Sequence, residues 1–416
     1  MKPHLERPNW VRRLNGFGSA VGDARLIVPL DPEELLASAR SSTGLDEVGD
    51  EAWQDIFERR IRAIDSESGA NVIGRLLCRA ETIRILQTRL RLHRAWAEAP
   101  QILEEPIERP IFVMGPPRTG TTILLELLAL DPKLRAPVAW EAHHPLPHGE
   151  AVDAVSSMAL AESEQELWAD IQPELMTLHE LRSDLPCECI HFMALEFGSN
   201  YWDMQYVTPS FAAWAGTQPD IVPRTYRSHR RFLQTLQYNS ADAGRRRRWL
   251  LKSPVHMSSL PMLFAEYPDA TVVQTVRDPM KFVGSTASTT AMMNWLRTDT
   301  VERKVHGQLA LLGFAGILNL VRTQRSDGTL PNDQFVDSPY VDLIANPSAA
   351  LKKIYEHAGL DWPAGHEGTI EAYLRDKPKG KFGKHEYTLE EYGLSEEMIR
   401  TTYADYIAHY GIEPES

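Results

Sequence analysis

The chain has 416 residues, of which 43% are hydrophobic, and its 44 basic and 57 acidic residues give a formal net charge of −13. This length and hydrophobic content are typical of a globular protein with one large α/β domain, or with a core domain and a helical addition. The acidic excess disfavours a general nucleic-acid-binding protein, which needs a basic surface. We therefore expect no nucleic-acid partner, and any anion site should be positive only locally.

The cysteine content and the N-terminus indicate a cytoplasmic protein. Cys78, Cys187 and Cys189 are too few for a disulfide framework, and the first residues lack the apolar core of a signal peptide. The most apolar run, residues 309–321, contains Gly and Asn and is too short to span a bilayer. We expect no transmembrane segment, while contact with a membrane surface stays open.

Residues 31–99 have the pattern of helices. Asp31 is placed to cap the first of them and Pro32 to occupy its first position. Apolar side chains recur at helical spacing, which predicts two or three helices packed on the rest of the chain. We take residues 1–105 as an N-terminal helical region. Its basic side chains are interpreted as a solvated face: Arg84, Arg89, Arg91 and Arg94.

Residues 110–130 are predicted to form a strand, a loop and a helix. The apolar run 110–114 precedes Gly115-Pro-Pro-Arg-Thr-Gly-Thr-Thr122, and a Leu-rich stretch follows. The first N–H groups of such a helix are unpaired, so the turn can bind a phosphate, and Gly120 permits close approach of the backbone. Further hydrogen-bond donors come from Arg118, Thr119, Thr121 and Thr122.

The same loop has the glycine spacing of a nucleoside-triphosphate loop, but not its lysine. Residue 121, directly after Gly120, would then be Lys, and it is Thr. That lysine normally reaches the β and γ phosphates. Its absence argues against ATP or GTP and for a nucleotide with a single 5′-phosphate group.

Residues 134–144 follow as a second short extended segment that ends in ionisable side chains. In an open parallel sheet, ligands bind beyond the carboxyl ends of the strands. If this segment is a strand, Glu141, His143 and His144 lie at the ligand-binding edge. The two histidines are equally compatible with a polar loop.

Residues 150–240 are rich in aromatic side chains and are interpreted as a mainly helical insertion. The insertion could form an acceptor pocket or could simply be helical core. Cys187-x-Cys189-x-His191 offers too few ligands at the wrong spacing for a structural zinc site, so no metal is expected there. The aromatic residues counted are Trp168, Phe192, Phe197, Tyr201, Trp202, Tyr206, Phe211, Trp214, Tyr226 and Phe232.

Two later strands are followed by residues suited to anions. Lys252 ends the apolar run 249–252, where a long cation needs an anionic partner, and His256 lies nearby or belongs to the next helix. The β-branched strand 270–276 leads to Arg277 and Ser285. A guanidinium and a hydroxyl at a helix terminus suit a dianionic phosphate.

Four motifs together resemble sulfotransferases that use 3′-phosphoadenosine 5′-phosphosulfate (PAPS). Residues 117–122 resemble the 5′-phosphosulfate loop, particularly that of the tyrosylprotein and the bacterial carbohydrate or lipid branches. Lys252-Ser-Pro is similar to the segment whose Lys contacts the sulfate-bridging oxygen, and Arg277 and Ser285 have the spacing of the pair that holds the 3′-phosphate. Residues 377–383 resemble the loop that closes over that phosphate.

The resemblance implies further donor-binding residues. Tyr340, after a predicted strand at 334–337, falls where the family often places an aromatic ring against adenine. In the closing loop the corresponding residues are Lys379, Gly380 and Lys381, although Pro378 stands where the family usually has Arg. Glycines and cationic side chains are suited to a lid that becomes ordered on binding.

The fold implied by the resemblance is an α/β, P-loop nucleotide-kinase-like, three-layer core with a central parallel sheet. It spans residues 106–416 and includes the aromatic-rich insertion at about 150–240. The implied activity is transfer of a sulfuryl group from PAPS to a hydroxyl, and because that group carries one negative charge no metal is demanded. The aromatic content favours a hydrophobic small molecule or lipid as the acceptor.

The resemblance also suggests a catalytic base. Glu141 lies just after the helix that follows the 5′-phosphosulfate loop, where the tyrosylprotein branch has its glutamate. Lys252 would stabilise the leaving oxygen. His256, His143 and His144 are the alternative bases. A P-loop kinase-like phosphotransferase and a non-catalytic nucleotide-binding protein are the alternative functions, and the oligomeric state is left open.

Overall fold

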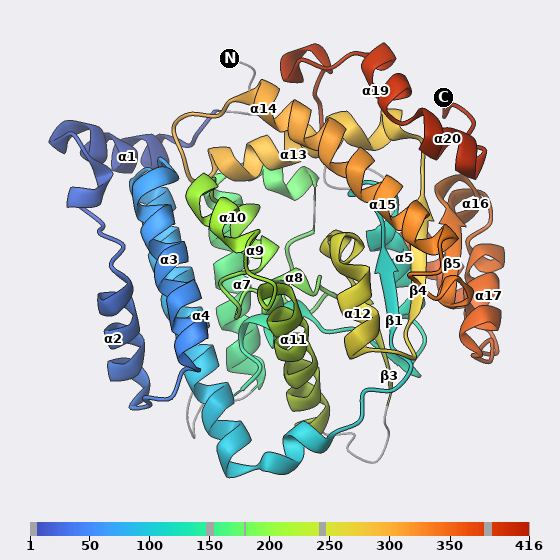
Figure 1. Cartoon of the computed structure of the whole chain (residues 1–416), viewed down its shortest axis with the longest axis horizontal. Coiled ribbons are helices and arrows are strands. Elements are labelled where there is room, and N and C mark those ends of the chain that lie inside the picture. The colour runs from blue at the N-terminus through green and yellow to red at the C-terminus, as the bar shows by residue number, and fades with distance from the viewer. Residues whose placement is uncertain (1–5, 147–153, 179, 241–246, 378–384, 416) are drawn as a thin grey trace.

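A five-stranded parallel sheet forms the centre of the protein (Figure 1). The computed structural model describes residues 6–146, 154–178, 180–240, 247–377 and 385–415. The strand order is β2-β3-β1-β4-β5, with Val113 beside Lys252 and Met114 beside Gln274. All pairs are parallel, so the carboxyl ends of the strands meet at one edge. The strands are β1 Ile111–Met114, β2 Leu134–Arg135, β3 Arg248–Lys252, β4 Thr271–Val276 and β5 Phe335–Pro339.

Alternate side chains of β1 enter two different hydrophobic clusters, because successive residues of a strand point to opposite faces. Ile111 and Val113 pack with the helix that follows β1, α5 (Thr121–Leu128), and with α17 (Pro347–Ala358). Phe112 and Met114 join a larger cluster built from the N-terminal helices, the insertion and the helices after β3. Helices thus cover both faces, which confirms the predicted three-layer α/β core.

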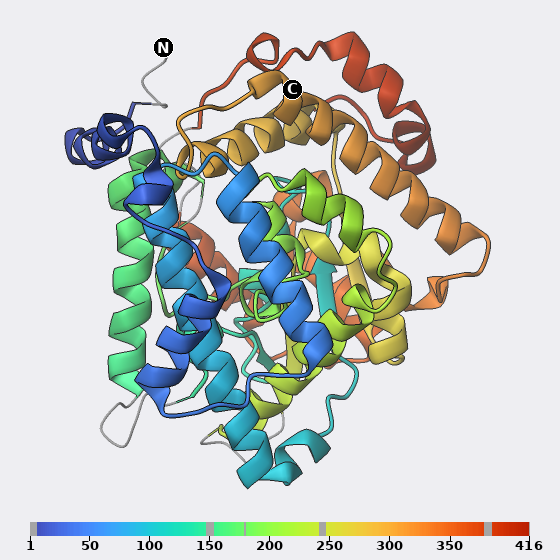
Figure 2. The same ribbon diagram turned by 60° about the vertical axis from the view of Figure 1, so that its left-hand side comes forward.

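The described part of the N-terminal region, from residue 6 onward, forms four helices and two short 3₁₀ turns. Asp31 caps α2 by accepting a hydrogen bond from the N–H of Glu33, with Pro32 at the first position as predicted. Figure 2 brings these helices to the front of the molecule. Trp53 and Phe57 on α3 pack against Phe197 of the insertion. The elements are α1 Asn9–Val21, η2 Ala24–Leu26, α2 Pro32–Thr43, α3 Glu51–Glu67, α4 Val72–Glu98 and η3 Pro100–Glu104.

Arg89 corrects the prediction of a solvated face, and Arg84 is also mostly buried, in an ion pair with Glu164. Arg89 is buried, and its guanidinium donates a hydrogen bond of 2.7 Å to the buried carboxylate of Glu196. Removal of either partner of a buried ion pair destabilises the fold strongly, because the other charge is left buried and unpaired. Sequence spacing could not reveal it, because Glu196 belongs to the insertion. The proposed boundary near residue 105 stays a prediction, since one hydrophobic cluster runs across it.

The insertion is helical, as predicted, and most of its aromatic rings are core. Trp202, Phe197 and Phe192 are buried, and Phe192 stacks on Phe232 with ring centroids 4.5 Å apart. These rings fill the space between α4 and the sheet rather than lining an open pocket. The helices are α7 Ala154–Ile171, η4 Pro173–Thr177, α8 Ile190–Met193, α9 Asn200–Asp203, α10 Pro209–Ala215 and α11 Ile221–Tyr238.

The segment 134–144 differs from the predicted strand. Only Leu134 and Arg135 pair with β3, and Ala139–His143 form the short helix α6. The carboxylate of Glu141 accepts a hydrogen bond from the N–H of Val138, which satisfies a free donor at the start of the helix. Glu141, His143 and His144 therefore leave the sheet edge on a helical turn or directly after one.

The C-terminal half supplies the remaining helices. A long helical stretch composed of α14, the π-helical turn η6 and α15 crosses the top of Figure 1, and the C-terminal helices α19 and α20 lie beside it. The elements are η5 Pro254–Ser259, α12 Leu260–Glu266, α13 Pro279–Trp295, α14 Arg303–Gln308, η6 Leu309–Gly313, α15 Phe314–Ser326, η7 Asn332–Gln334, α16 Tyr340–Ala345, α17 Pro347–Ala358, α18 His366–Asp376, η8 Glu390–Tyr392, α19 Glu396–Thr402 and α20 Ala404–Tyr410.

Candidate active site

The loop between β1 and α5 has the conformation of an anion-binding turn. Gly120 adopts φ 91°, and a Cβ atom there would lie 2.8 Å from the ring of Tyr340. At Gly115 a Cβ atom would lie 1.9 Å from the hydroxyl of Thr275. Both glycines are therefore required by close contacts. The free N–H groups that start α5 open at the carboxyl edge of the sheet.

The threonines of this loop have different roles. The hydroxyl of Thr119 is buried, 2.7 Å from the carbonyl oxygen of Pro116 and 2.5 Å from the hydroxyl of Thr275. These contacts hold the loop against β4, so the Thr119 hydroxyl is already engaged with protein groups. Thr122 is exposed and Thr121 is buried, both in the first turn of α5.

Lys252 extends from the end of β3 to the first turn of α5. Its ammonium group donates a hydrogen bond of 3.3 Å to the hydroxyl of Thr122. The same group forms an ion pair with Glu188, whose carboxylate also accepts a hydrogen bond of 3.2 Å from Ser253. A lysine from a neighbouring strand thus reaches the loop that lacks a lysine at position 121.

Glu188 is the residue that sequence reasoning missed at this end of the site. It precedes α8 in the insertion, and the N–H of the next residue, Cys189, donates a 2.9 Å hydrogen bond to the carbonyl oxygen of Lys252. The one available signal was that a lysine at a strand end needs an anionic partner. That rule predicts a carboxylate without saying which one.

Glu141 lies in a different environment from Glu188. Its carboxylate accepts hydrogen bonds from the guanidinium of Arg135 at 2.8 Å and from the N–H of Val138 at 3.1 Å. Both Glu141 and Arg135 have side chains that are mostly buried. The described contacts of Glu141 therefore hold the start of α6 to the β2 edge, whereas Glu188 contacts Lys252.

The three histidines that were alternative bases are also held by protein groups. His143 Nδ1 lies 2.9 Å from Glu164, and His144 pairs with the same carboxylate. Burial lowers the pKa of His143. His256 is wholly buried on η5, with Nδ1 2.9 Å from the hydroxyl of Tyr226, and burial lowers its pKa to about 3. None of these contacts joins a histidine to Lys252.

Arg277 occupies the other end of the candidate site, after β4. Its guanidinium donates a 2.6 Å hydrogen bond to the carbonyl oxygen of Arg118 and lies 3.7 Å over the ring of Tyr340. Desolvation, and then the like charge of Arg277, lower the pKa of Arg118. The 5′ loop, Arg277 and Tyr340 therefore converge, as the sequence predicts.

A carboxylate from the C-terminal segment already contacts Arg277. Glu415 accepts hydrogen bonds from Nε and Nη2 of Arg277 at 2.9 to 3.1 Å. The backbone N–H groups of Asp278 and Glu415 each donate a hydrogen bond to the carboxylate of the other residue, which holds the segment in place. Two oxygens on one guanidinium are the arrangement that a phosphate would adopt.

Ser285 is buried on α13, beside a tyrosine that sequence reasoning did not select. The ring of Tyr387 would lie 2.6 Å from a Cβ atom at Gly284, so that ring packs directly on this part of α13. Desolvation raises the pKa of the Tyr387 hydroxyl, which the neighbouring charges of Arg118 and Arg277 oppose. Tyr387 therefore joins the same corner as both arginines.

The predicted closing loop lies mainly outside the described residues. Lys379, Gly380 and Lys381 fall within residues 378–384, and their interactions stay predictions. Lys377 is described, and its ammonium group pairs with Glu126 at 2.6 Å and Glu180 at 3.0 Å. Its described partners are thus acidic side chains of α5 and of the segment that follows η4.

The long helical stretch from Arg303 to Ser326 combines a buried and an exposed apolar face. By length and composition alone it could cross a membrane, and about a third of its most apolar part is buried in the protein. Ala310, Leu311, Leu318 and Val321 pack into the core. The opposite face forms a groove of about 370 Å³ lined by Lys304, Val305, Gln308, Leu309, Leu312 and Gly313.

Comparison with known proteins agrees with this geometry. The model of the sulfotransferase family matches residues 110–364. The chain is 25% identical over 329 residues to omega-hydroxy-beta-dihydromenaquinone-9 sulfotransferase Stf3 of Mycobacterium bovis, covering 73% of this chain and 75% of the relative. The Stf3 of Mycobacterium tuberculosis gives the same values.

Two solved structures resemble the whole molecule. Sulfotransferase STF9 from Mycobacterium avium is 26% identical with a TM-score of 0.80, covering 93% of this chain and 98% of that one. STF1 from Mycobacterium tuberculosis H37Rv is 30% identical with a TM-score of 0.70, covering 90% and 98%. With the family model matching more than half of its length, this chain belongs to the sulfotransferase family.

Proposed function

We propose that the protein transfers a sulfuryl group from PAPS to a hydroxyl group of an apolar, lipid-like acceptor. The observation that carries the proposal is the position of Lys252, which reaches the first turn of α5 from β3 and pairs with Glu188. Family membership supports sulfuryl transfer over the kinase-like alternative, and it leaves the donor and the acceptor to be tested.

The described residues fit the two charged ends of PAPS. The start of α5 offers N–H groups and the exposed Thr122 for a 5′-phosphosulfate, and Arg277 offers a guanidinium for a 3′-phosphate. Arg118 and Arg277 lie together as like charges, an arrangement that a bound anion stabilises. When bound, PAPS would supply an activated sulfuryl group.

The proposed chemistry assigns one task to each of two side chains. The acceptor oxygen bonds to sulfur while the bond between sulfur and the bridging phosphate oxygen breaks, so negative charge grows on that oxygen. Lys252 and the N–H groups of the loop would stabilise this charge. The proton of the acceptor hydroxyl would pass to a carboxylate, for which we propose Glu188 in place of Glu141, because Glu188 contacts Lys252 and Ser253.

The support for an apolar acceptor comes from a relative and not from the aromatic side chains of the insertion. The insertion aromatics are mostly core, and a cleft beside Met193, Val222 and Tyr226 has room for only about 20 Å³. Stf3, in contrast, is named for a menaquinone derivative with an ω-hydroxyl group. We therefore propose a hydroxyl on a long apolar molecule, met at a membrane surface by the exposed face of α14 and η6.

The donor is tested by sulfate transfer from labelled PAPS to a panel of hydroxylated quinones, lipids, phenols and sugars. Transfer to an apolar acceptor, abolished in Lys252→Met with nucleotide binding retained, is the expected result. Binding of 3′-phosphoadenosine 5′-phosphate without any transfer would instead favour a non-catalytic nucleotide-binding protein. Turnover with free sugars alone would reject the apolar acceptor.

The membrane contact is tested separately by co-sedimentation with phosphatidylcholine–phosphatidylglycerol vesicles. Leu309 and Leu312 are 64% and 58% exposed, and the double variant Leu309→Asp, Leu312→Asp should lose vesicle binding. Leu160, 45% exposed on α7, provides the control Leu160→Asp. Equal binding by all three proteins would contradict the assigned face.

A further inference from the structure

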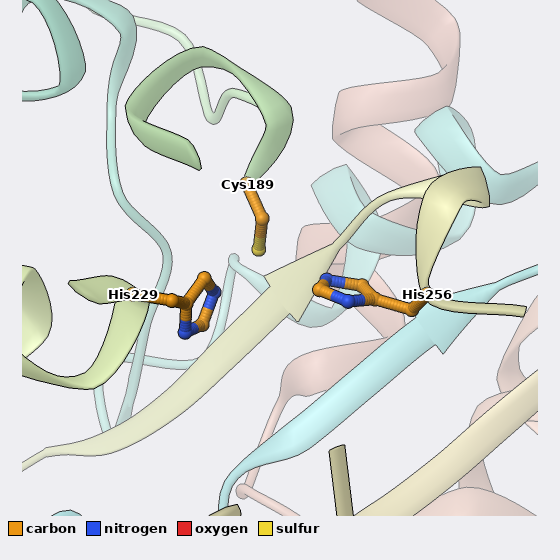
Figure 3. Close-up of side chains that lie close together, drawn as sticks. All are labelled: Cys189, His229 and His256. Carbon is orange, nitrogen blue, oxygen red and sulfur yellow. The ribbon is translucent and has the colours of Figure 1, made fainter. Parts of the chain in front are cut away.

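Three potential metal ligands from distant parts of the sequence meet in the core behind Lys252. Cys189 precedes α8, His229 is on α11 and His256 is on η5, and the three side chains converge in Figure 3. One ligand atom from each lies within 4.8 Å of the others, and all three residues are wholly buried. The candidate differs from the Cys187-x-Cys189-x-His191 pattern and shares only Cys189 with it.

Each histidine is held by one ring nitrogen and leaves the other unused. His229 Nδ1 lies 2.7 Å from the hydroxyl of Tyr267, and His256 Nδ1 lies 2.9 Å from that of Tyr226. Among the residues that the structure describes, neither Nε2 atom has a hydrogen-bond partner. Metal-binding histidines are commonly oriented in this way, with an oxygen on the second ring nitrogen.

We propose that Cys189, His229 and His256 bind a thiophilic d¹⁰ cation, Zn²⁺ or Cu⁺. One sulfur and two imidazole nitrogens suit these ions, whereas Mg²⁺ and Ca²⁺ require oxygen ligands. Ligand atoms around a tetrahedral Zn²⁺ are roughly 3.3 to 3.6 Å apart, so side-chain rotations that move these atoms by about an ångström would bring all three to binding distance. The fourth position of Zn²⁺ would be left to a small non-protein ligand. The thiol proton is released to solvent when the metal–sulfur bond forms.

The position of the cluster gives the ion a structural role. The N–H of Cys189 bonds to the carbonyl oxygen of Lys252, and the neighbouring Glu188 pairs with the ammonium group of Lys252. A bound ion would join the insertion, α11 and the segment after β3 directly behind this pair. It would thereby hold the Lys252–Glu188 pair in register without contacting substrate.

The experiment measures metal binding on the full chain, independently of sulfuryl transfer. Chelator-treated protein is titrated with Co²⁺ as a spectroscopic substitute, then with competing Zn²⁺, and in a separate anaerobic arm with Cu⁺. One equivalent should bind, with a thiolate-to-cobalt absorption band. The relative displacement by Zn²⁺ and Cu⁺ identifies the preferred ion.

Matched variants separate the site from adventitious binding. Cys189→Ser should lose the absorption band, while Cys187→Ser, which changes another buried cysteine two positions away, should keep it. In His256→Asn the side-chain amide can replace Nδ1 toward Tyr226 while the Nε2 ligand is removed. The metal affinity of this variant should fall by more than the roughly 10- to 100-fold expected when only the hydrogen-bond partner of a metal ligand is lost.

The outcomes distinguish this proposal from the proposed function. Failure of the parent protein to bind any of the three ions, or equal binding by the Cys189 and Cys187 variants, would overturn the metal site. The sulfotransferase assignment would then be unaffected. Metal binding with no sulfuryl transfer would support the site and count against the catalytic proposal alone.

Discussion

The two ends of the candidate nucleotide site both pair a cation with a carboxylate, but the carboxylates come from different places. At the 5′ end, Glu188 of the insertion holds Lys252 and also accepts a hydrogen bond from Ser253. At the 3′ end, Glu415 of the C-terminal segment holds Arg277 with both oxygens. A cation at an anion site needs a partner when the anion is absent.

The difference between the two carboxylates suggests different roles. Glu188 lies beside the strand and loop where the sulfuryl group would be, so it can accept a proton there. Glu415 occupies the guanidinium N–H groups of Arg277 that a 3′-phosphate would use, so we expect it to compete with that phosphate. The first should be required for turnover, and the second should oppose nucleotide binding. Each of the following experiments tests one side of this comparison.

The largest effect is expected at Glu188. Glu188→Gln keeps a hydrogen-bond acceptor for Lys252 but removes the base, and should slow single-turnover transfer by about 10²- to 10⁴-fold. Glu141→Gln is the matched control, and His256→Asn tests the histidine alternative. A slow Glu141 variant beside a Glu188 variant with near-parent rate would restore Glu141 as the base. A dead Asn variant with intact nucleotide affinity would assign His256 as the base if Cys189→Ser, which removes another ligand of the proposed metal site, still transfers the group.

The second-largest effect is expected when the guanidinium of Arg277 is removed. Arg277→Ala should weaken binding of 3′-phosphoadenosine 5′-phosphate by roughly 1.5 to 3 kcal/mol, about 10- to 150-fold. Adenosine 5′-phosphosulfate lacks the 3′-phosphate and should lose much less affinity. Calorimetry with both nucleotides measures the difference. Equal losses would mean that Arg277 does not distinguish the 3′ end.

Some of the residues tested in these experiments were predictable from the sequence, and others were not. The loop, Lys252 and Arg277 were predictable because each directly follows or ends an apolar strand, and parallel strands present their carboxyl ends together. Tyr340 was expected only from the resemblance to the sulfotransferase family. Glu188, Glu415 and Tyr387 were not, because their partners lie far away in the chain and pairing depends on tertiary contacts. The Cys189–His229–His256 cluster was missed for the same reason.

One local prediction was wrong and one open alternative was narrowed, for reasons visible in the structure. Residues 134–144 were expected to be extended, but the side chain of Glu141 reaches back to the N–H of Val138 and starts a helix. The aromatic-rich insertion was compatible with a pocket or with helical core, and rings such as Trp202 and Phe232 are buried core. Composition alone does not separate a ligand pocket from a core.

A smaller effect of opposite sign is expected at Glu415. Glu415→Gln removes the charge that competes for Arg277 and should tighten binding of 3′-phosphoadenosine 5′-phosphate. The side chains of the competing pair are mostly buried, and the net contribution of such a hydrogen-bonded contact is roughly 1 kcal/mol, so the gain is about fivefold. Glu413→Gln provides a control in the same segment. Weaker binding in the Glu415 variant would show that Glu415 positions Arg277 rather than competing with the phosphate.

The smallest effect is expected at Tyr340, whose ring contacts the guanidinium of Arg277. Its ring lies 3.7 Å from the Arg277 guanidinium and also packs beside Gly120, so it orients the arginine and adjoins the loop. Tyr340→Leu removes a cation–π contact worth roughly 0.5 to 1 kcal/mol, and nucleotide affinity should fall about two- to fivefold. Tyr340→Phe keeps the ring and should bind like the parent. If the ring contacts adenine as well, the Leu variant should lose affinity for adenosine 5′-phosphosulfate too, whereas a loss confined to the nucleotide with a 3′-phosphate would limit Tyr340 to positioning Arg277. An unchanged affinity in the Leu variant for both nucleotides would remove Tyr340 from the site.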